Sequence, residues 1–248
     1  MEDFVTLKSD FEERVKEVNL FFDVVAAEEN VELTVVKGIA TQVLTVGPMP
    51  ADWARMMKAT GYLVIYNLVE AFVRRGFQAV FDAIKNDSLS VGDLIVEIRK
   101  QWTIQRNRAI KTYDGSPKLY MDLSHDIVEE IVTKQVAHLS REKLPFSGNI
   151  DADVIRKTCF KHGVPFQSSA PAKGGSQLEI VKVKRNALSH GDESFEECGR
   201  HATAQEMIDI KTETVQFMRD LLASLEKFST TKAYRITAPT PSVSTAVP

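Results

Sequence analysis

Arg185 and His190 are the residues whose types and spacing most suggest chemistry. They lie in the segment Ser176 to Gly191, which we predict as a helix capped by Ser176 and ended by Gly191. Three apolar residues share one face of this helix: Leu178, Val181 and Leu188. Arg185 falls among them, where another apolar residue is expected. Because a guanidinium on an apolar face is unfavourable without a partner or ligand, Arg185 is a candidate functional residue.

An arginine and a histidine together can cleave RNA without a metal. The guanidinium binds two phosphoryl oxygens and never deprotonates, and an imidazole with a pKa near 6.5 exchanges protons at neutral pH. The 2′-hydroxyl of the RNA would attack the adjacent phosphate, while His190 moves a proton and Arg185 stabilises the phosphorane. The window from Lys173 to His190 holds four basic residues and one acid, whereas four acids follow between Asp192 and Glu197, so the positive charge is local.

The spacing of the pair poses a geometric problem. Five residues on a regular helix rotate by about 500°, which leaves Arg185 and His190 about 140° apart. Either the helix ends or kinks there, or a second subunit completes the site, and a twofold dimer would bring two copies of the segment together. The alternative is structural, with Arg185 paired to Glu70 and His190 capping the helix. Arg156 and His162 have a similar spacing, so we take them as an internal control with little expected effect.

Other motifs give no further site. Lys173-Gly174-Gly175-Ser176 lacks the ending of a phosphate-binding loop and is predicted to be a turn. Neither His125 with Glu129 nor Cys159 with His162 has an evident third metal ligand. We predict that His125 and Glu129 lie at the surface, and that Cys159 and His162 are a core residue and a helix cap. No metal or cofactor is predicted. Two isolated cysteines and the absence of a run of about 20 apolar residues predict a cytoplasmic protein with no membrane segment.

The elements that must position the pair are helical. The chain has 248 residues, 44% of them hydrophobic, and a net charge of −3, which is typical of a globular protein with its own core. We predict one all-α domain over 1–237, a small hairpin near 31–46, a helical insertion over 86–175 and a disordered tail over 238–248. The predicted helices are 9–29, 51–75, 77–85 after a break at Gly76, 91–101, 120–139, 151–162 and 203–228. Caps are expected at Ser9/Glu12, Ser90/Asp93, Ser176/Glu179 and Thr203/Glu206.

The segment from Arg185 to Gly191 resembles the R-N-x-x-x-H signature of HEPN domains, which are helical bundles and include many metal-independent ribonucleases. Three further stretches are similar to a prokaryotic branch found in anti-phage and toxin–antitoxin loci: 66–70 (YNLVE), 148–151 (GNID) and 194–195 (SF). The resemblance covers about residues 10–235. It implies an all-α HEPN-type bundle and a homodimer with RNA as substrate. An antitoxin or another defence-locus protein is a possible partner.

The resemblance also assigns roles to residues. Arg185 and His190 are implied to be catalytic and Asn186 to orient them or the phosphate. Independently of the resemblance, Glu70 and Asn67 are three residues apart on one face of the predicted helix 51–75, so we expect them to face Arg185 and support the site. Lys182 and Ser189 are also expected to support it, with Lys182 and Lys184 contacting RNA. HEPN toxins that are silenced by adenylation carry a tyrosine two residues after the histidine, and here that residue is Asp192. The other functions left open are a HEPN module that only binds RNA or a protein, and a structural dimerisation subunit of a defence complex.

Overall fold

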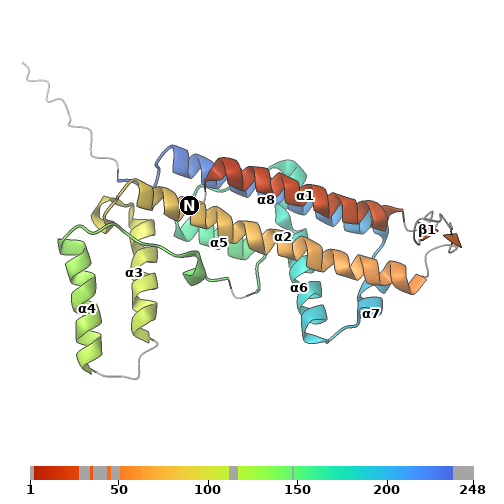
Figure 1. The fold of residues 1–248 in the computed structure, drawn as a ribbon, viewed down its shortest axis with the longest axis horizontal. Helices are drawn as coiled ribbons and strands as arrows, with labels where there is room; N and C mark the ends of the chain where they lie inside the picture. Colours follow the sequence, from red (N-terminus) through yellow and green to blue (C-terminus); the bar gives the residue numbers. More distant parts are fainter. Residues whose placement is uncertain are drawn as a thin grey trace, which may run out of the picture.

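Three long helices lie side by side and form the body of the protein (Figure 1). They are α1 (Phe4–Ala26), α2 (Ala51–Asn86) and α8 (Ala204–Thr230). The computed structural model describes residues 3–27, 34–35, 44–45, 51–111, 117–146 and 148–236. Ion pairs from Lys8 to Glu226 and from Asp10 to Arg75 join the first half of α1 to the second halves of α8 and α2. Helix α1 therefore runs antiparallel to the other two, and one hydrophobic core extends from Leu7 to Tyr234.

Local capping explains where α1 and α8 begin. Helix α8 follows Thr203, whose hydroxyl and backbone exchange hydrogen bonds with Glu206 as predicted. Helix α1 instead follows Asp3, whose carboxylate accepts hydrogen bonds from the backbone N–H groups of Val5 and Thr6. The predicted start at Ser9 is therefore wrong, because Ser9 lies inside α1. The predicted end at residue 29 is also too late, since α1 ends at Ala26.

Helix α2 is one continuous helix of 36 residues, so the predicted break at Gly76 is wrong. A Cβ atom at Gly76 would lie 2.7 Å from Cδ1 of Leu225 on α8. Gly61 has the same role near the start of α2, where a Cβ would lie 2.8 Å from Cε of Met207. Both glycines therefore allow α2 and α8 to pack closely, and the energy of that packing exceeds the roughly 1 kcal/mol by which a glycine disfavours a helix interior.

The segment between α2 and α6 contains short helices. They are η1 (Val91–Asp93), α3 (Val96–Lys111), α4 (Pro117–Val132), η2 (Arg141–Lys143), α5 (Ala152–Lys161) and η3 (Ala170–Gly175). Helices α3 and α4 project from one end of the body (Figure 1). The predicted helix 151–162 corresponds to α5, with Asp151 as its cap. The prediction 91–101 begins and ends too early for α3, and the prediction 120–139 begins and ends too late for α4. Ser90 and Asp93 form the predicted capping box, on η1.

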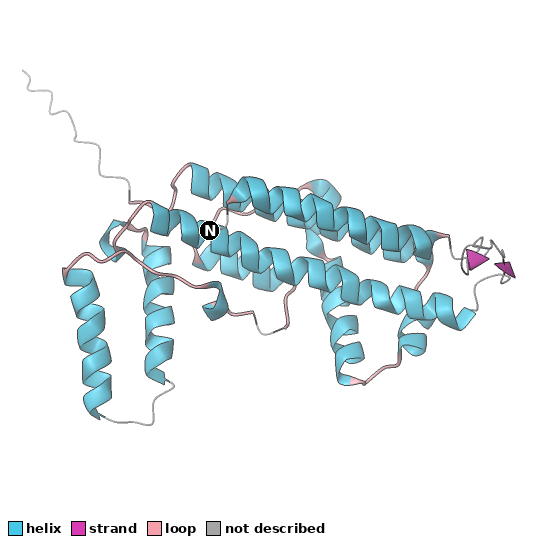
Figure 2. Ribbon diagram, in the orientation of Figure 1, coloured by secondary structure: helices cyan, strands magenta, loops and turns pink. Residues whose placement is uncertain are grey.

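Two strands of two residues each follow α1 and precede α2 in the chain, and they lie beyond the ends of these helices (Figure 2). β1 (Thr34–Val35) and β2 (Leu44–Thr45) pair antiparallel, with Thr34 opposite Thr45. The predicted hairpin is confirmed for these four residues. The rest of 31–46 and the tail 238–248 lie outside the described residues.

His162 ends α5 and is buried in the core. Its Nδ1 lies 2.8 Å from the carbonyl oxygen of Thr158, and its ring contacts the rings of Phe77 and Phe81 with centroids 5.0 and 5.8 Å away. This confirms the prediction of a core and cap residue. His162 is therefore unsuitable as a control variant, because substituting a buried ring disturbs the core. Burial lowers the pKa of His162 to about 4.

This buried histidine predicts a loss of stability in mild acid. The unfolded chain protonates His162 below its ordinary pKa near 6.5, whereas the folded chain protonates it only near 4. The free energy of unfolding should therefore fall by roughly 2 kcal/mol between pH 7 and pH 5 from this residue alone. Urea denaturation across that range should show a flatter pH dependence for His162→Gln. An equally steep dependence in the variant would show that other groups cause it.

Candidate active site

Helix α6 (Gln177–His190) carries the candidate residues, and α7 (Phe195–Arg200) follows it. Helix α6 leads to a loop at its far end, and α7 returns from this loop to pack on α2 (Figure 2). Helix α6 ends as predicted at Gly191, which adopts a left-handed φ of 76° and donates its N–H to the carbonyl of Ala187. The predicted Ser176/Glu179 cap is wrong, because Ser176 has helical dihedral angles and makes no capping hydrogen bond through its side chain.

Arg185 lies half-buried against α2. Its guanidinium carbon is 4.5 Å from the centre of the Tyr66 ring, and Nη1 donates to the carbonyl of Gly148 at 3.3 Å and to Oδ1 of Asn186 at 3.0 Å. No carboxylate of the described residues pairs with it, and Glu70 instead binds Arg74 at 2.9 Å. The alternative of an Arg185–Glu70 ion pair is therefore wrong. The charge of Arg185 is held in place by neutral groups and remains available to an anion.

Tyr66 is a residue of this site for which the sequence predicted no role. Its ring is buried and forms the surface over which Arg185 lies. Its hydroxyl oxygen accepts a hydrogen bond from the N–H of Ile150 at 3.2 Å, and burial raises the pKa of the phenol. The available signal was a tyrosine one turn before Glu70 on a helix that is apolar nearly all round. Tyr66 thus joins α2, α6 and the loop before α5.

Asn186 connects the Arg185 side of α6 to the His190 side. Its Oδ1 accepts from Arg185, and its Nδ2 donates to Oδ1 of Asn149 at 2.6 Å. Asn186 precedes His190 by four residues, which places their Cβ atoms about 5–6 Å apart on one helix face. The amide therefore lies between the guanidinium and the imidazole.

His190 and Ser189 are exposed at the end of α6. The helix is uninterrupted from Gln177 to His190, so it contains no kink that would turn Arg185 towards His190. The two residues are separated by about 140° around the axis and a rise of about 7.5 Å. Arg185 and His190 can therefore act on one phosphate in two ways. Either the RNA extends across the Asn186 side of α6, or a second subunit supplies one of the two residues.

The lysines of α6 have carboxylate partners. Lys182 Nζ lies 2.7 Å from Asp151 and 2.9 Å from Glu179, and its side chain is 18% exposed. Hydrogen bonds to these two carboxylates raise the pKa of Lys182. Lys184 Nζ lies 3.0 Å from Glu193. Lys182 thus fastens α6 to the cap of α5, and in α6, all of which is described, Arg185 is the one cation without a carboxylate partner.

Asn67 lies away from Arg185. It is exposed and lines a cavity on the α1 side of α2, together with Arg14 and Glu17. The expectation that Asn67 faces Arg185 is therefore wrong. It followed from placing Asn67 and Glu70 on one face, whereas the residue of α2 directed at Arg185 is Tyr66.

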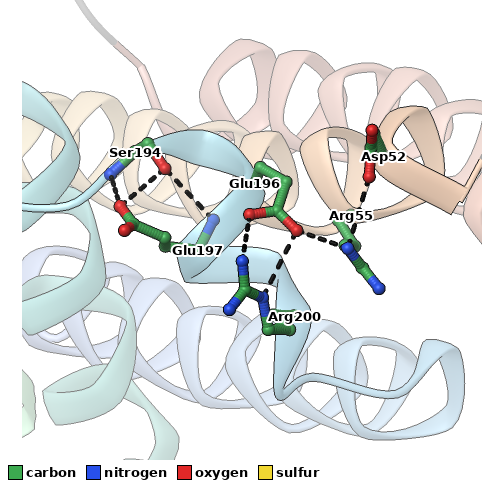
Figure 3. Close-up of polar contacts among 6 residues, drawn as sticks. All are labelled: Asp52, Arg55, Ser194, Glu196, Glu197 and Arg200. Carbon is green, nitrogen blue, oxygen red and sulfur yellow. Dashed lines mark hydrogen bonds and ion pairs between the residues drawn. The ribbon is translucent and has the colours of Figure 1, made fainter.

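Helix α7 is held firmly against α2 after the loop that follows α6. Figure 3 shows Arg55 of α2 and Arg200 of α7 both directed at the carboxylate of Glu196. Ser194 and Glu197 form a capping box at the start of α7 (Figure 3). The spacing of these two residues is the signal in the sequence from which α7 could have been predicted. These contacts fix the chain that follows His190.

Gly199 makes the contact between α7 and α2 possible. A Cβ atom at this position would lie 1.9 Å from the backbone oxygen of Arg55, so only a glycine permits the observed approach. The two helices therefore touch through their backbones, and the α6–α7 arm has a rigid base.

No three histidine, cysteine, aspartate or glutamate side chains converge as metal ligands in the described part of the chain, and no helix there is long and apolar enough to cross a bilayer. His125 and Glu129 are both exposed on α4, as predicted. Burial raises the pKa of Cys159 to about 12, which removes this thiol from reactivity near neutral pH.

The fold and the site define a class of protein: an all-helical bundle with an Arg-Asn-x-x-x-His segment at the end of a helix. The family model HEPN_MAE_28990, which describes a HEPN domain, matches residues 5–234. The chain therefore belongs to the HEPN family, a family of ribonuclease modules often found in defence systems. No curated protein and no solved structure showed significant similarity to it.

Proposed function

We propose that the protein is a metal-independent endoribonuclease that acts as a toxin or anti-phage effector. The observation that carries the proposal is the uncompensated guanidinium of Arg185, held over Tyr66 and linked by Asn186 to the side of α6 that bears His190. A buried or half-buried cation without a carboxylate partner is unfavourable unless an anion binds it. A phosphodiester is an anion that matches the arginine fork.

The proposed reaction uses the RNA's own nucleophile. His190 takes the proton of the 2′-hydroxyl as its oxygen bonds to phosphorus, and Arg185 stabilises the negative charge of the phosphorane. The bond to the 5′-oxygen then breaks, and the leaving oxygen takes a proton from solvent. The products are a 2′,3′-cyclic phosphate and a 5′-hydroxyl end. Asn186 holds the guanidinium in position from one side and Tyr66 from the other.

We further propose that the protein forms a homodimer through the outer face of α6, which would bring two copies of the motif together. Ile180 and Val183 on this face are 44% and 51% exposed. His190 follows Val183 by seven residues, so it lies on the same face two turns later. A second copy packed on these apolar side chains would place its own α6 beside His190. Arg185 lies about 160° round the helix from Val183, so the partner's guanidinium would have to reach the shared phosphate past the Asn186 side of its helix.

Cleavage of RNA by the purified protein in EDTA tests the proposal. Sequencing of new 5′-hydroxyl ends in total RNA should reveal defined cleavage sites. Cleavage that requires added Mg²⁺ would contradict the metal-independent mechanism. RNA binding that depends on Arg185, without cleavage, would assign the motif to phosphate binding alone.

A further inference from the structure

A cationic groove lies at the end of α5 remote from Arg185. Four basic side chains line its main cavity of about 690 Å³: Arg99, Lys100, Lys143 and Lys161. No aspartate or glutamate is among the described residues that line this cavity. Apolar side chains of Val96, Ile104 and Leu144 cover part of the wall. The groove therefore combines a cluster of basic side chains with apolar surface.

An exposed aromatic ring extends this groove. A neighbouring cavity of about 440 Å³ shares Lys100 and Lys161 with the first and is also lined by Phe160, whose side chain is 82% exposed. Glu97 is the one acid among the described residues of this second cavity. A phenylalanine this exposed contributes almost nothing to the core, so its ring is free to contact a ligand.

Two polar atoms at the groove have unused hydrogen-bonding capacity. Nε of Arg99 and Nε2 of His162 are buried and lack a hydrogen-bond partner among the described residues, and both side chains line the main cavity. The other ring nitrogen of His162, Nδ1, contacts the carbonyl oxygen of Thr158, and its ring packs against that of Phe77. Unsatisfied polar atoms beside a cationic cavity favour a polar occupant over a purely apolar one.

Helix α5 connects this groove to the candidate active site. Its capping residue Asp151 binds Lys182 of α6, and its last residue Lys161 lines the groove. A helix of this length spans about 15 Å. Four or five stacked nucleotides cover that distance at about 3.4 Å each.

We propose that the groove formed by α3, α5 and η2 binds single-stranded RNA, with its phosphates on Arg99, Lys100 and Lys161 and an unpaired base stacked on Phe160. A positively charged groove with an exposed aromatic ring is the combination by which proteins hold single strands. A duplex keeps its bases stacked inside and cannot offer one to Phe160. The inference rests on the proposed function, since it defines the substrate as single-stranded RNA.

The test measures RNA binding in a His190→Ala background, which keeps the RNA intact. Fluorescence anisotropy in EDTA compares a labelled single strand of about 12 nucleotides with the duplex of the same sequence. The single strand should bind more tightly. Phe160→Ala should weaken its binding by about 5- to 100-fold, and Phe160→Trp should restore it, because the role requires a ring. Trp53→Ala, which removes another exposed ring, on α2, should change nothing.

The cations of the groove give a second readout. Replacing both Lys100 and Lys161 by alanine should reduce the salt dependence of binding by about 0.7 per lysine in the slope of log K against log salt. Unchanged affinity of Phe160→Ala, or equal affinity for the duplex, would overturn the inference. So would dissociation of Phe160→Ala into monomers with RNA affinity intact, because Phe160 would then be a subunit contact.

The two proposals fail separately. If RNA binding depends on Phe160 but the wild type does not cleave RNA, the RNA-binding groove is supported and the nuclease function is contradicted. If the wild type cleaves RNA in EDTA but Phe160→Ala binds RNA with unchanged affinity, the nuclease function is supported and the groove is contradicted.

Discussion

His190→Ala should cleave RNA about 10²- to 10⁴-fold more slowly than the wild type, with an unchanged melting temperature. The rate should fall because proton transfer from the 2′-hydroxyl loses its base. Stability should be preserved because the side chain is exposed at the end of α6 and forms no hydrogen bond with the described residues. Initial rates on a defined RNA in EDTA, together with thermal melting, provide the measurement.

His125→Ala is the matched control for this variant. His125 is also exposed on a helix, but it lies on α4, away from α6. Its variant should cleave at the wild-type rate. If His190→Ala is as active as His125→Ala, then the imidazole takes no part in the reaction.

Arg185→Ala should reduce cleavage by about 10²- to 10³-fold, with a larger effect on kcat than on KM. The guanidinium is expected to bind the phosphorane more strongly than the ground-state phosphate, because negative charge grows on the phosphoryl oxygens during attack. Arg185→Lys should recover little of the rate, since a lysine keeps the charge but lacks the planar fork. Steady-state kinetics on a short RNA would separate the two parameters.

The chain contains a matched control for the structural contacts of this arginine. Arg156 also lies over a ring, 5.6 Å from the centre of Phe217, and donates to a glycine carbonyl, that of Gly174. Arg156→Ala should therefore lose a similar amount of stability, about 0.5–2 kcal/mol, while retaining cleavage. An equal loss of activity in both variants would mean that Arg185 acts through the fold rather than on the phosphate.

The helices with local signals could be predicted from the sequence, and those set by tertiary contacts could not. Thr203 and Asp151 cap α8 and α5 through side chains that lie within three residues of their partners. The local rules predict a break at Gly76, but this glycine lies inside α2 and makes room for Leu225, which lies about 150 residues later in the chain. Ser9 has the spacing of a cap, yet Asp3 provides an earlier one.

In the candidate site, too, the local signals could be predicted from the sequence and the tertiary contacts could not. The out-of-place arginine was visible because Arg185 breaks the apolar pattern of its own helix. Its surroundings were not, since Tyr66 and Gly148 reach it from distant parts of the chain. The expectation for Asn67 failed because Asn67 lies about 100° around α2 from Tyr66, and the pattern of α2 alone does not indicate which of these sides α6 covers.

Mixing of two inactive variants tests most directly whether Arg185 and His190 of different subunits meet at one phosphate. Arg185→Ala and His190→Ala protomers, exchanged into heterodimers, each supply the residue that the other lacks. The composite site predicts that activity rises well above that of either variant, to about a quarter of the wild type if half of the dimers are mixed and each has one intact site. Confirmed subunit exchange without any gain in activity would contradict the composite site.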